Sequence, residues 1–220
     1  MRLLSFHGKQ EVKDFYQARL YEHAAADELI KGQYWENGKG CAVGCTIHSR
    51  EHATYETELG LPEWLARLED VIFEGLSNSE AKQFAVDFLA AIPVGVDLAP
   101  VRWQFCAFIL RENIERVLSL DFAAELKKQV VDAIRAVLAC HKTAIKTGKW
   151  EDTVARSAWF AAKSAWLATR SAWLAESTWF AARSAWLATR SATESTWFAA
   201  KSATYTRYAD LLLKLLRAAK

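Results

Sequence analysis

The sequence has few residues that break helices, and none of them lies near its end. All nine Gly and all three Pro occur at or before Gly148. Long apolar runs are also missing, which argues against a membrane-spanning helix of about 20 apolar residues. The opening MRLLSFHGKQ has no apolar core or cleavage site, so we expect no secretory signal. With only four Cys, we expect reduced thiols and a cytoplasmic protein rather than a disulfide framework.

The balance of charge changes along the chain. Residues 1–150 contain 18 Lys and Arg against 21 Asp and Glu, whereas residues 151–220 contain 10 against 5. This positive excess is small, and a solvated helix face explains it more simply than a nucleic-acid or membrane surface. Because the composition also shifts near this point, we predict an all-α domain over 1–148, with a Gly-rich loop at 32–44, and repeat helices over 149–220 packed on it.

Apolar residues recur at helical spacing through most of the first 150 positions. Phe15, Leu20 and Leu29 would lie on one side of a first helix, and Ser77 or Asn78 suits the N-cap of a later one. The predicted helices span 10–30, 46–52, 62–75, 77–92, 97–118 and 121–147. Strand signals are scarce. The predicted fold class is therefore all-α, a helical bundle.

A tandem repeat fills the last third of the chain. Units SAWFAAKSAW, STWFAARSAW and STWFAAKSAT begin at Ser157, Ser177 and Ser195. Repetition of this kind is typical of a packing or binding surface. The stretch 189–196 has no large apolar residue, which predicts a turn there and a C-terminal Trp/Ala heptad-repeat helical hairpin. A further break at 175–177 stays open.

Trp side chains line this repeat, and most are followed four residues later by a cation. The candidate binding surface consists of Trp159, Trp166, Trp173, Trp179, Trp186 and Trp197. A Trp-lined packing face is the simplest interpretation, and a partner-binding or dimer face is the main alternative. Membrane insertion and single-stranded nucleic-acid stacking fit less well. We predict a protein partner or self-association, with no nucleic acid and no membrane.

Cys41, Cys45, His48 and His52 follow one another within twelve residues at the end of the Gly-rich loop. On a helix, spacings of 4, 3 and 4 would bring them toward one face, and thiolates and imidazoles are zinc ligands. Four ligands on one short helix rarely converge on one ion, so buried Cys and capping His are the simpler interpretation.

Two further patterns overlap this cluster. His48-Ser-Arg-Glu51-His52 matches the H-x-x-E-H signature of zinc proteases. Cys41 stands at an expected helix start, where free N–H groups would lower its pKa and favour a nucleophilic role. Neither pattern is complete, so no catalytic residue is assigned, and no cofactor is predicted apart from zinc as the alternative.

Three short segments carry a distinctive pattern: KGCAVGCT at 39–46, LGLP at 59–62 and EDVIFEGL at 69–76. With His52 and Tyr55 between them, they resemble an uncharacterised group of bacterial and phage-encoded proteins over about residues 30–100. The Ala/aromatic tail separately resembles tails on immunity proteins of bacterial toxin systems. These resemblances imply a cytoplasmic bacterial or phage protein and no particular reaction.

The functional prediction follows from the repeat surface and the lack of a complete catalytic motif. We predict a non-enzymatic protein-binding or immunity-like module. The alternative is a small metal- or thiol-dependent enzyme that uses Cys41, Cys45, His48 and His52.

Overall fold

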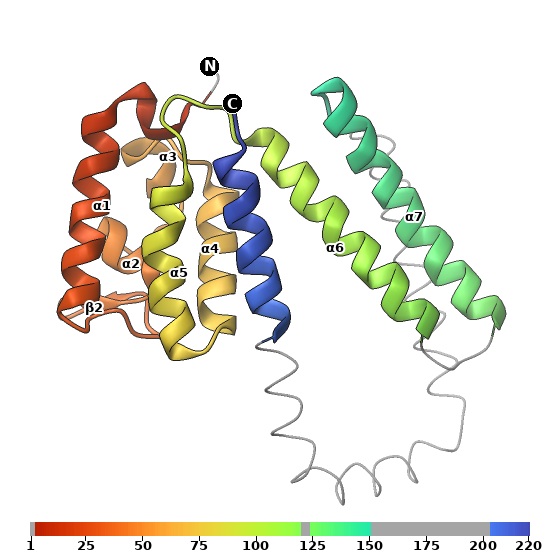
Figure 1. The fold of residues 1–220 in the computed structure, drawn as a ribbon, viewed down its shortest axis with the longest axis horizontal. Coiled ribbons are helices and arrows are strands. Elements are labelled where there is room, and N and C mark those ends of the chain that lie inside the picture. The colour runs from red at the N-terminus through yellow and green to blue at the C-terminus, as the bar shows by residue number, and fades with distance from the viewer. Residues whose placement is uncertain (1–2, 120–123, 151–202) are drawn as a thin grey trace, which may run out of the picture. The chain divides into compact units, whose positions relative to one another are not determined.

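The computed structural model describes residues 3–119, 124–150 and 203–220. They are mostly helical, and the fold is all-α, as predicted (Figure 1). The elements are η1 (Ser5–Gly8), α1 (Gln10–Ala25), β1 (Trp35–Glu36), β2 (Lys39–Gly40), α2 (Ala42–Ile47), α3 (Thr54–Glu58), α4 (Glu63–Gly75), α5 (Asn78–Ala91), α6 (Ala99–Ser119), α7 (Ala124–Thr147) and a final helix over 203–217. None of the described helices has the length and apolar character needed to cross a membrane. The described residues form two compact units, 3–101 with 203–220 and 102–119 with 124–150.

The first unit is built around α4 and α5, which pack on each other. Helix α1 packs on α5, and the short α2 contacts both α1 and α4. The final helix belongs to this unit: Thr206 Oγ1 donates to Glu80 Oε1 at 2.9 Å, and the Tyr205 ring lies so close to Gly75 that no Cβ would fit there. The largest fully buried side chains include Leu20, Tyr55, Leu65, Ile72, Phe73, Phe88, Leu89 and Leu212.

Helices α4 and α5 begin and end close to where the sequence predicts. Ser77 is the N-cap of α5: its Oγ accepts the Glu80 N–H at 3.4 Å, and Glu80 Oε2 accepts the Ser77 N–H at 3.2 Å. This reciprocal capping box satisfies two amides that the first turn leaves free. The helix ends at Ala91, just before Pro93, which cannot continue it.

The first helix is shorter than predicted. Helix α1 ends at Ala25 instead of Ile30, because Asp27 adopts a left-handed conformation with φ of 58°. The chain then runs beside β2, where the Ile30 N–H donates to Gly40 O at 2.8 Å and the Gly40 N–H donates to Glu28 O at 3.1 Å. A long-range backbone pairing therefore replaces the last predicted turn.

The buried side of α1 also differs in one position. Leu20 is buried as predicted, and Leu29 is buried too, although it lies beyond the helix. Phe15 is 55% exposed, and its ring lies beneath the Arg19 guanidinium instead. Its place in the core is taken by Tyr16, whose O–H donates to Glu58 Oε2 at 2.6 Å. Tyr16, whose O–H has a polar partner, is therefore buried, and the apolar ring of Phe15 is not.

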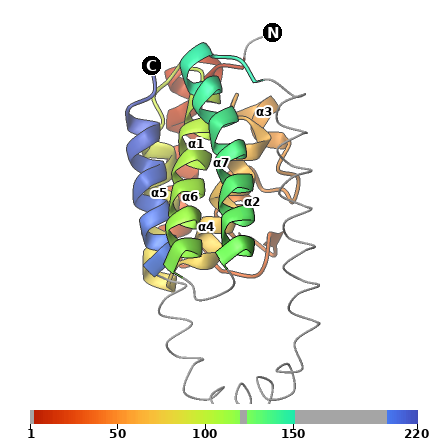
Figure 2. The same cartoon turned by 90° about the vertical axis from the view of Figure 1, so that its right-hand side faces the viewer.

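In the second unit, α6 and α7 lie side by side, as Figures 1 and 2 both show. Just before this unit, the Ala99 N–H at the start of α6 donates to Asp97 Oδ1 at 2.9 Å. Buried residues on α7 are Val131, Ala133, Leu138, Cys140 and Ala144. The predicted repeat hairpin and its turn at 189–196 lie outside the described residues, so the division into 1–148 and 149–220 stays a prediction.

Candidate functional site

The Gly-rich loop is held against α2 by close backbone contacts at Tyr34. The Cys41 N–H donates to Gln33 O at 2.6 Å and to Tyr34 O at 3.2 Å. A Cβ on Gly44 would lie 1.5 Å from Tyr34 O, and one on Gly40 would lie 1.9 Å from it. Only glycine fits at either position, since any other side chain would displace the loop.

Part of this loop is a β-hairpin that the sequence analysis treated as irregular. Strands β1 and β2 pair antiparallel, with Trp35 opposite Gly40. Asn37 and Gly38 form the turn with φ of 52° and 81°. An Asn-Gly pair with two positive φ angles is the strongest short hairpin signal, so the sequence contained the information needed to place Trp35.

Both thiols of the predicted cluster are interior groups. Cys41 is the N-cap of α2, and its Sγ accepts the Gly44 N–H at 3.5 Å. Cys45 is fully buried and its S–H donates to Gly40 O at 3.4 Å. Burial raises the pKa of Cys41 and raises the pKa of Cys45 to about 12. The expected helix start is therefore correct, but the lowered pKa predicted for Cys41 is wrong, because burial outweighs the helix N-terminus.

The two histidines of the cluster lie in different surroundings. Helix α2 covers Ala42–Ile47 rather than 46–52, and His48 ends it in a left-handed conformation with φ of 52°. His52 lies in the turn before α3 and is buried, with Nε2 3.6 Å from Asp70 Oδ2. The premise that all four residues share one helix face is therefore wrong. Among the described residues, no group of three or more His, Cys, Asp or Glu side chains is arranged to hold a metal ion.

The H-x-x-E-H pattern does not form a local unit either. His48 Nε2 lies 2.8 Å from His23 Nε2, whereas His52 lies beside Asp70 and meets the Tyr34 ring edge to face. Glu51 is exposed between them. The two imidazoles that would share a zinc ion in such a protease are thus engaged with different partners.

A small pocket lies between the Gly-rich loop and α4. Its volume is about 240 Å³, and its lining residues are Gly32, Gln33, Tyr34, Cys41, Asp70 and Glu74. We call it the acidic pocket, because the described residues that line it include two carboxylates and no Lys or Arg. Glu74 Oε1 accepts the Gly32 N–H at 2.9 Å, which ties the loop to α4. The charge of Asp70 raises the pKa of Tyr34, so this phenol stays neutral.

Next to Asp70 on α4, Glu69 is a fully buried carboxyl group. Its Oε2 accepts the Tyr55 O–H at 2.8 Å, while its Oε1 has no hydrogen-bond partner among the described residues. Burial raises the pKa of Glu69 to about 8, and the nearby Asp70 adds to this effect. Glu69 is therefore mostly protonated at neutral pH, a state that perturbed carboxyl groups at functional sites often adopt.

Asp70 and Glu74, which give this region its charge, and Tyr34, its aromatic ring, were not predicted from the sequence. Asp70 and Glu74 are four apart on α4, a spacing that places both on one helix face and could have been noticed. Tyr34 reaches the pocket through the hairpin. No sequence pattern links the loop to α4, because that contact depends on the tertiary packing of α2 against both.

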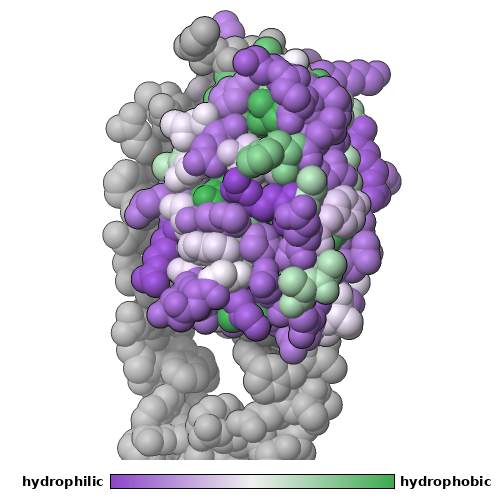
Figure 3. Space-filling model, turned by 90° about the vertical axis from the view of Figure 1, so that its left-hand side faces the viewer, coloured by the Kyte–Doolittle hydropathy of each residue, from purple (hydrophilic) through white to green (hydrophobic). Residues whose placement is uncertain are grey.

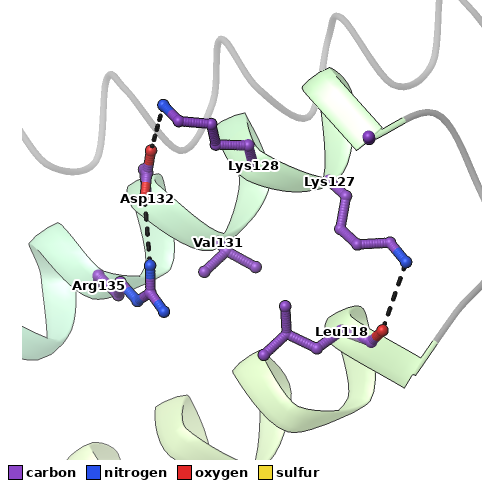
Figure 4. Close-up of a pocket in the computed structure, with 7 residues that line it drawn as sticks. Leu118, Lys127, Lys128, Val131, Asp132 and Arg135 are labelled. Atoms are coloured by element: carbon purple, nitrogen blue, oxygen red, sulfur yellow. Dashed lines mark hydrogen bonds and ion pairs between the residues drawn. The ribbon is translucent and has the colours of Figure 1, made fainter.

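A hollow in the second unit has the opposite character (Figure 4). Its volume is about 500 Å³, and it is lined by Leu118, Ala124, Lys127, Lys128, Val131, Asp132 and Arg135. Asp132 contacts both Lys128, at 3.1 Å, and Arg135, at 3.5 Å, and Lys127 Nζ donates to Leu118 O at 3.3 Å. The cations of this hollow are thus engaged with α6 and α7 themselves.

The Trp side chains of the repeat, Trp159 to Trp197, lie outside the described residues, so their predicted binding surface stays a prediction. No family model, curated protein or solved structure with which the chain was compared matches it. The functional argument therefore rests on the described residues and their geometry.

Proposed function

We propose that this chain is a non-enzymatic binding module that recognises a basic segment of another protein. The described residues of the first unit, 3–101 with 203–220, contain 12 Lys and Arg against 17 Asp and Glu, a net charge of −5. Opposite charge steers partners together and discriminates among them. The face of the molecule in Figure 3 is predominantly hydrophilic, with hydrophobic residues only scattered over it. Such a surface suits a charged partner better than an apolar one.

The acidic pocket is the observation that carries this proposal. Asp70 and Glu74 supply two carboxylates, and Tyr34 supplies an aromatic ring that is 45% exposed. A carboxylate pair with an aromatic ring is suited to an Arg or Lys side chain, through charge-assisted hydrogen bonds and a cation–π contact. We infer that one basic side chain of the partner enters the pocket, while the remaining acids attract the segment around it.

The thiol-dependent alternative has less support. Cys41 and Cys45 are buried and their pKa values are raised, whereas a nucleophilic thiol needs exposure and a lowered pKa. The resemblance of the tail to tails on immunity proteins fits a binding role as well. These observations favour recognition over chemistry.

Selection from a random peptide display library tests the proposal even though the partner is unidentified. The full chain is the bait, and the Asp70→Asn/Glu74→Gln double variant is compared with Glu11→Gln/Glu22→Gln, which removes the same charge from exposed positions on α1. We expect the parent chain and the α1 variant to select peptides that contain Arg or Lys. The pocket variant should bind those peptides at least 10-fold more weakly, which corresponds to about 1.4 kcal/mol.

The salt dependence and a neutral analogue sharpen the result. Affinity should fall as NaCl is raised, and replacing the critical Arg by citrulline should weaken binding as much as the pocket variant does. Peptides without basic residues, or equal losses in the pocket and α1 variants, would contradict a specific basic anchor.

A further inference from the structure

A histidine pair on the surface of the first unit joins two segments that are distant in sequence. His23 lies in the last turn of α1, and His48 ends α2. Their Nε2 atoms are 2.8 Å apart. On its other side, His23 Nδ1 lies 2.5 Å from Glu28 Oε2. The three side chains thus form a chain of contacts from the Glu28 carboxylate to the His23 imidazole and from there to the His48 imidazole.

We propose that His23 and His48 bind a divalent transition-metal ion such as Zn²⁺ or Cu²⁺ through their Nε2 atoms, with Glu28 as the residue that orients His23. A carboxylate on the far nitrogen of a metal-binding histidine is a common arrangement, because it fixes the tautomer and increases the basicity of the ligand nitrogen. With its Nδ1 proton held by Glu28, His23 directs an Nε2 lone pair toward His48. The remaining coordination positions are left for water.

The spacing of the two nitrogens suits this role after a small adjustment. If Glu28 holds the Nδ1 proton of His23, the proton between the two Nε2 atoms of the metal-free pair belongs to His48. Two nitrogens bound to one tetrahedral zinc ion at about 2.0–2.1 Å lie about 3.3 Å apart, so the 2.8 Å separation must open by about half an ångström. His48 must also carry its proton on Nδ1.

An aromatic wall supports one side of the pair. The Trp35 indole stacks on the His48 ring with centroids 4.3 Å apart and an interplanar angle of 8°. The Trp35 and His23 rings meet edge to face with centroids 5.3 Å apart. His48 itself is exposed, so an ion can reach the pair from solvent. Trp35 therefore holds the imidazole in place and lies close enough to report on the bound metal.

Isothermal titration of the full chain with ZnCl₂ and with CuCl₂ tests the site. His48→Asn removes the ligand with a residue that tolerates the left-handed backbone, and His23→Gln removes the other with a good helix former. The matched control is His7→Asn, because His7 also has a left-handed φ, of 53°. Far-UV circular dichroism verifies that each variant is folded.

We expect the parent chain and the His7→Asn control to bind one ion, with Cu²⁺ tighter than Zn²⁺. His23→Gln and His48→Asn should each weaken binding by at least 100-fold, and Glu28→Gln should weaken it by about 10- to 100-fold. Cu²⁺ should also quench fluorescence less in Trp35→Phe than in the parent chain. Binding that survives loss of either histidine, equal losses in the control, or no binding at millimolar metal would overturn the proposal.

Discussion

The first unit and the paired helices α6 and α7 carry opposite charge. The described residues of the first unit, 3–101 with 203–220, contain 12 Lys and Arg against 17 Asp and Glu, a net charge of −5. Residues 102–119 with 124–150 contain 9 Lys and Arg against 4 Asp and Glu, a net charge of +5. The whole chain, at +2, conceals this contrast. Dividing the sequence at residue 150 conceals it too, because the change of sign falls at the boundary between the structural units, near residue 101. Charge is therefore informative here only after it is assigned to structural units.

We expect the largest effect from a substitution in the first unit that displaces the Gly-rich loop, which lines the acidic pocket. Gly44→Ala would place a Cβ 1.5 Å from Tyr34 O, which the backbone of the loop cannot avoid without moving. We expect a loss of about 3 kcal/mol or more in the free energy of unfolding, measured by urea denaturation.

The control for this substitution is Gly38→Ala. Gly38 has a positive φ but no atom near its Cβ position, so its replacement should cost only backbone strain, about 1 kcal/mol. A Gly44→Ala variant as stable as Gly38→Ala would show that Tyr34 O does not closely contact Gly44.

The second prediction concerns Glu69, an acidic residue of the first unit whose side chain is mostly neutral at pH 7. The pKa of Glu69 is raised to about 8 by burial. Its carboxyl group stays protonated in the folded chain while the unfolded chain ionises, so its contribution to stability is present below the unfolded pKa and is lost as pH rises toward 8. Glu69→Gln should remove this dependence.

Urea denaturation between pH 5 and pH 8 measures the effect. Stability of the Gln variant relative to the parent chain should rise by up to about 1.4 kcal/mol per pH unit. The control Glu36→Gln replaces an exposed acid on β1 and should run parallel to the parent chain. If Glu69→Gln also runs parallel, the buried carboxyl group has an ordinary pKa.

We expect the smallest effect from a substitution in the basic second unit. Lys128→Ala removes a solvent-exposed contact to Asp132 on α7. Solvent and salt screen such a pair, so we expect no measurable change in thermal midpoint, with or without added NaCl. The variant would lower the positive charge of the α6–α7 pair without affecting its fold. A clear loss of stability would instead make the contact part of the helix packing.

Local rules predicted the longer helices α4 to α7 well, but they missed α3, misplaced α2 and predicted the candidate site poorly. Ser77 and Pro93 bound α5 because capping and helix termination depend on nearby residues. His23 and His48 meet across 25 positions, and only the packing of α1 against α2 brings them together. The helix start at Cys41 was predictable, but its thiol pKa depends on burial, which no local pattern encodes. The Asn37-Gly38 turn, by contrast, is a local hairpin signal that the sequence does contain.

The contact of Tyr34 O with Gly40 and Gly44 also bears on how this chain can diverge. Both glycines are constrained by a backbone atom rather than by the side chain of Tyr34. Substitutions at 33, 34 and 36 can therefore alter what the hairpin presents without requiring compensation at 40 or 44. The backbone of the loop therefore constrains positions 40 and 44 more than it constrains the side chains around them. We expect related chains to keep both glycines and to vary at 33, 34 and 36.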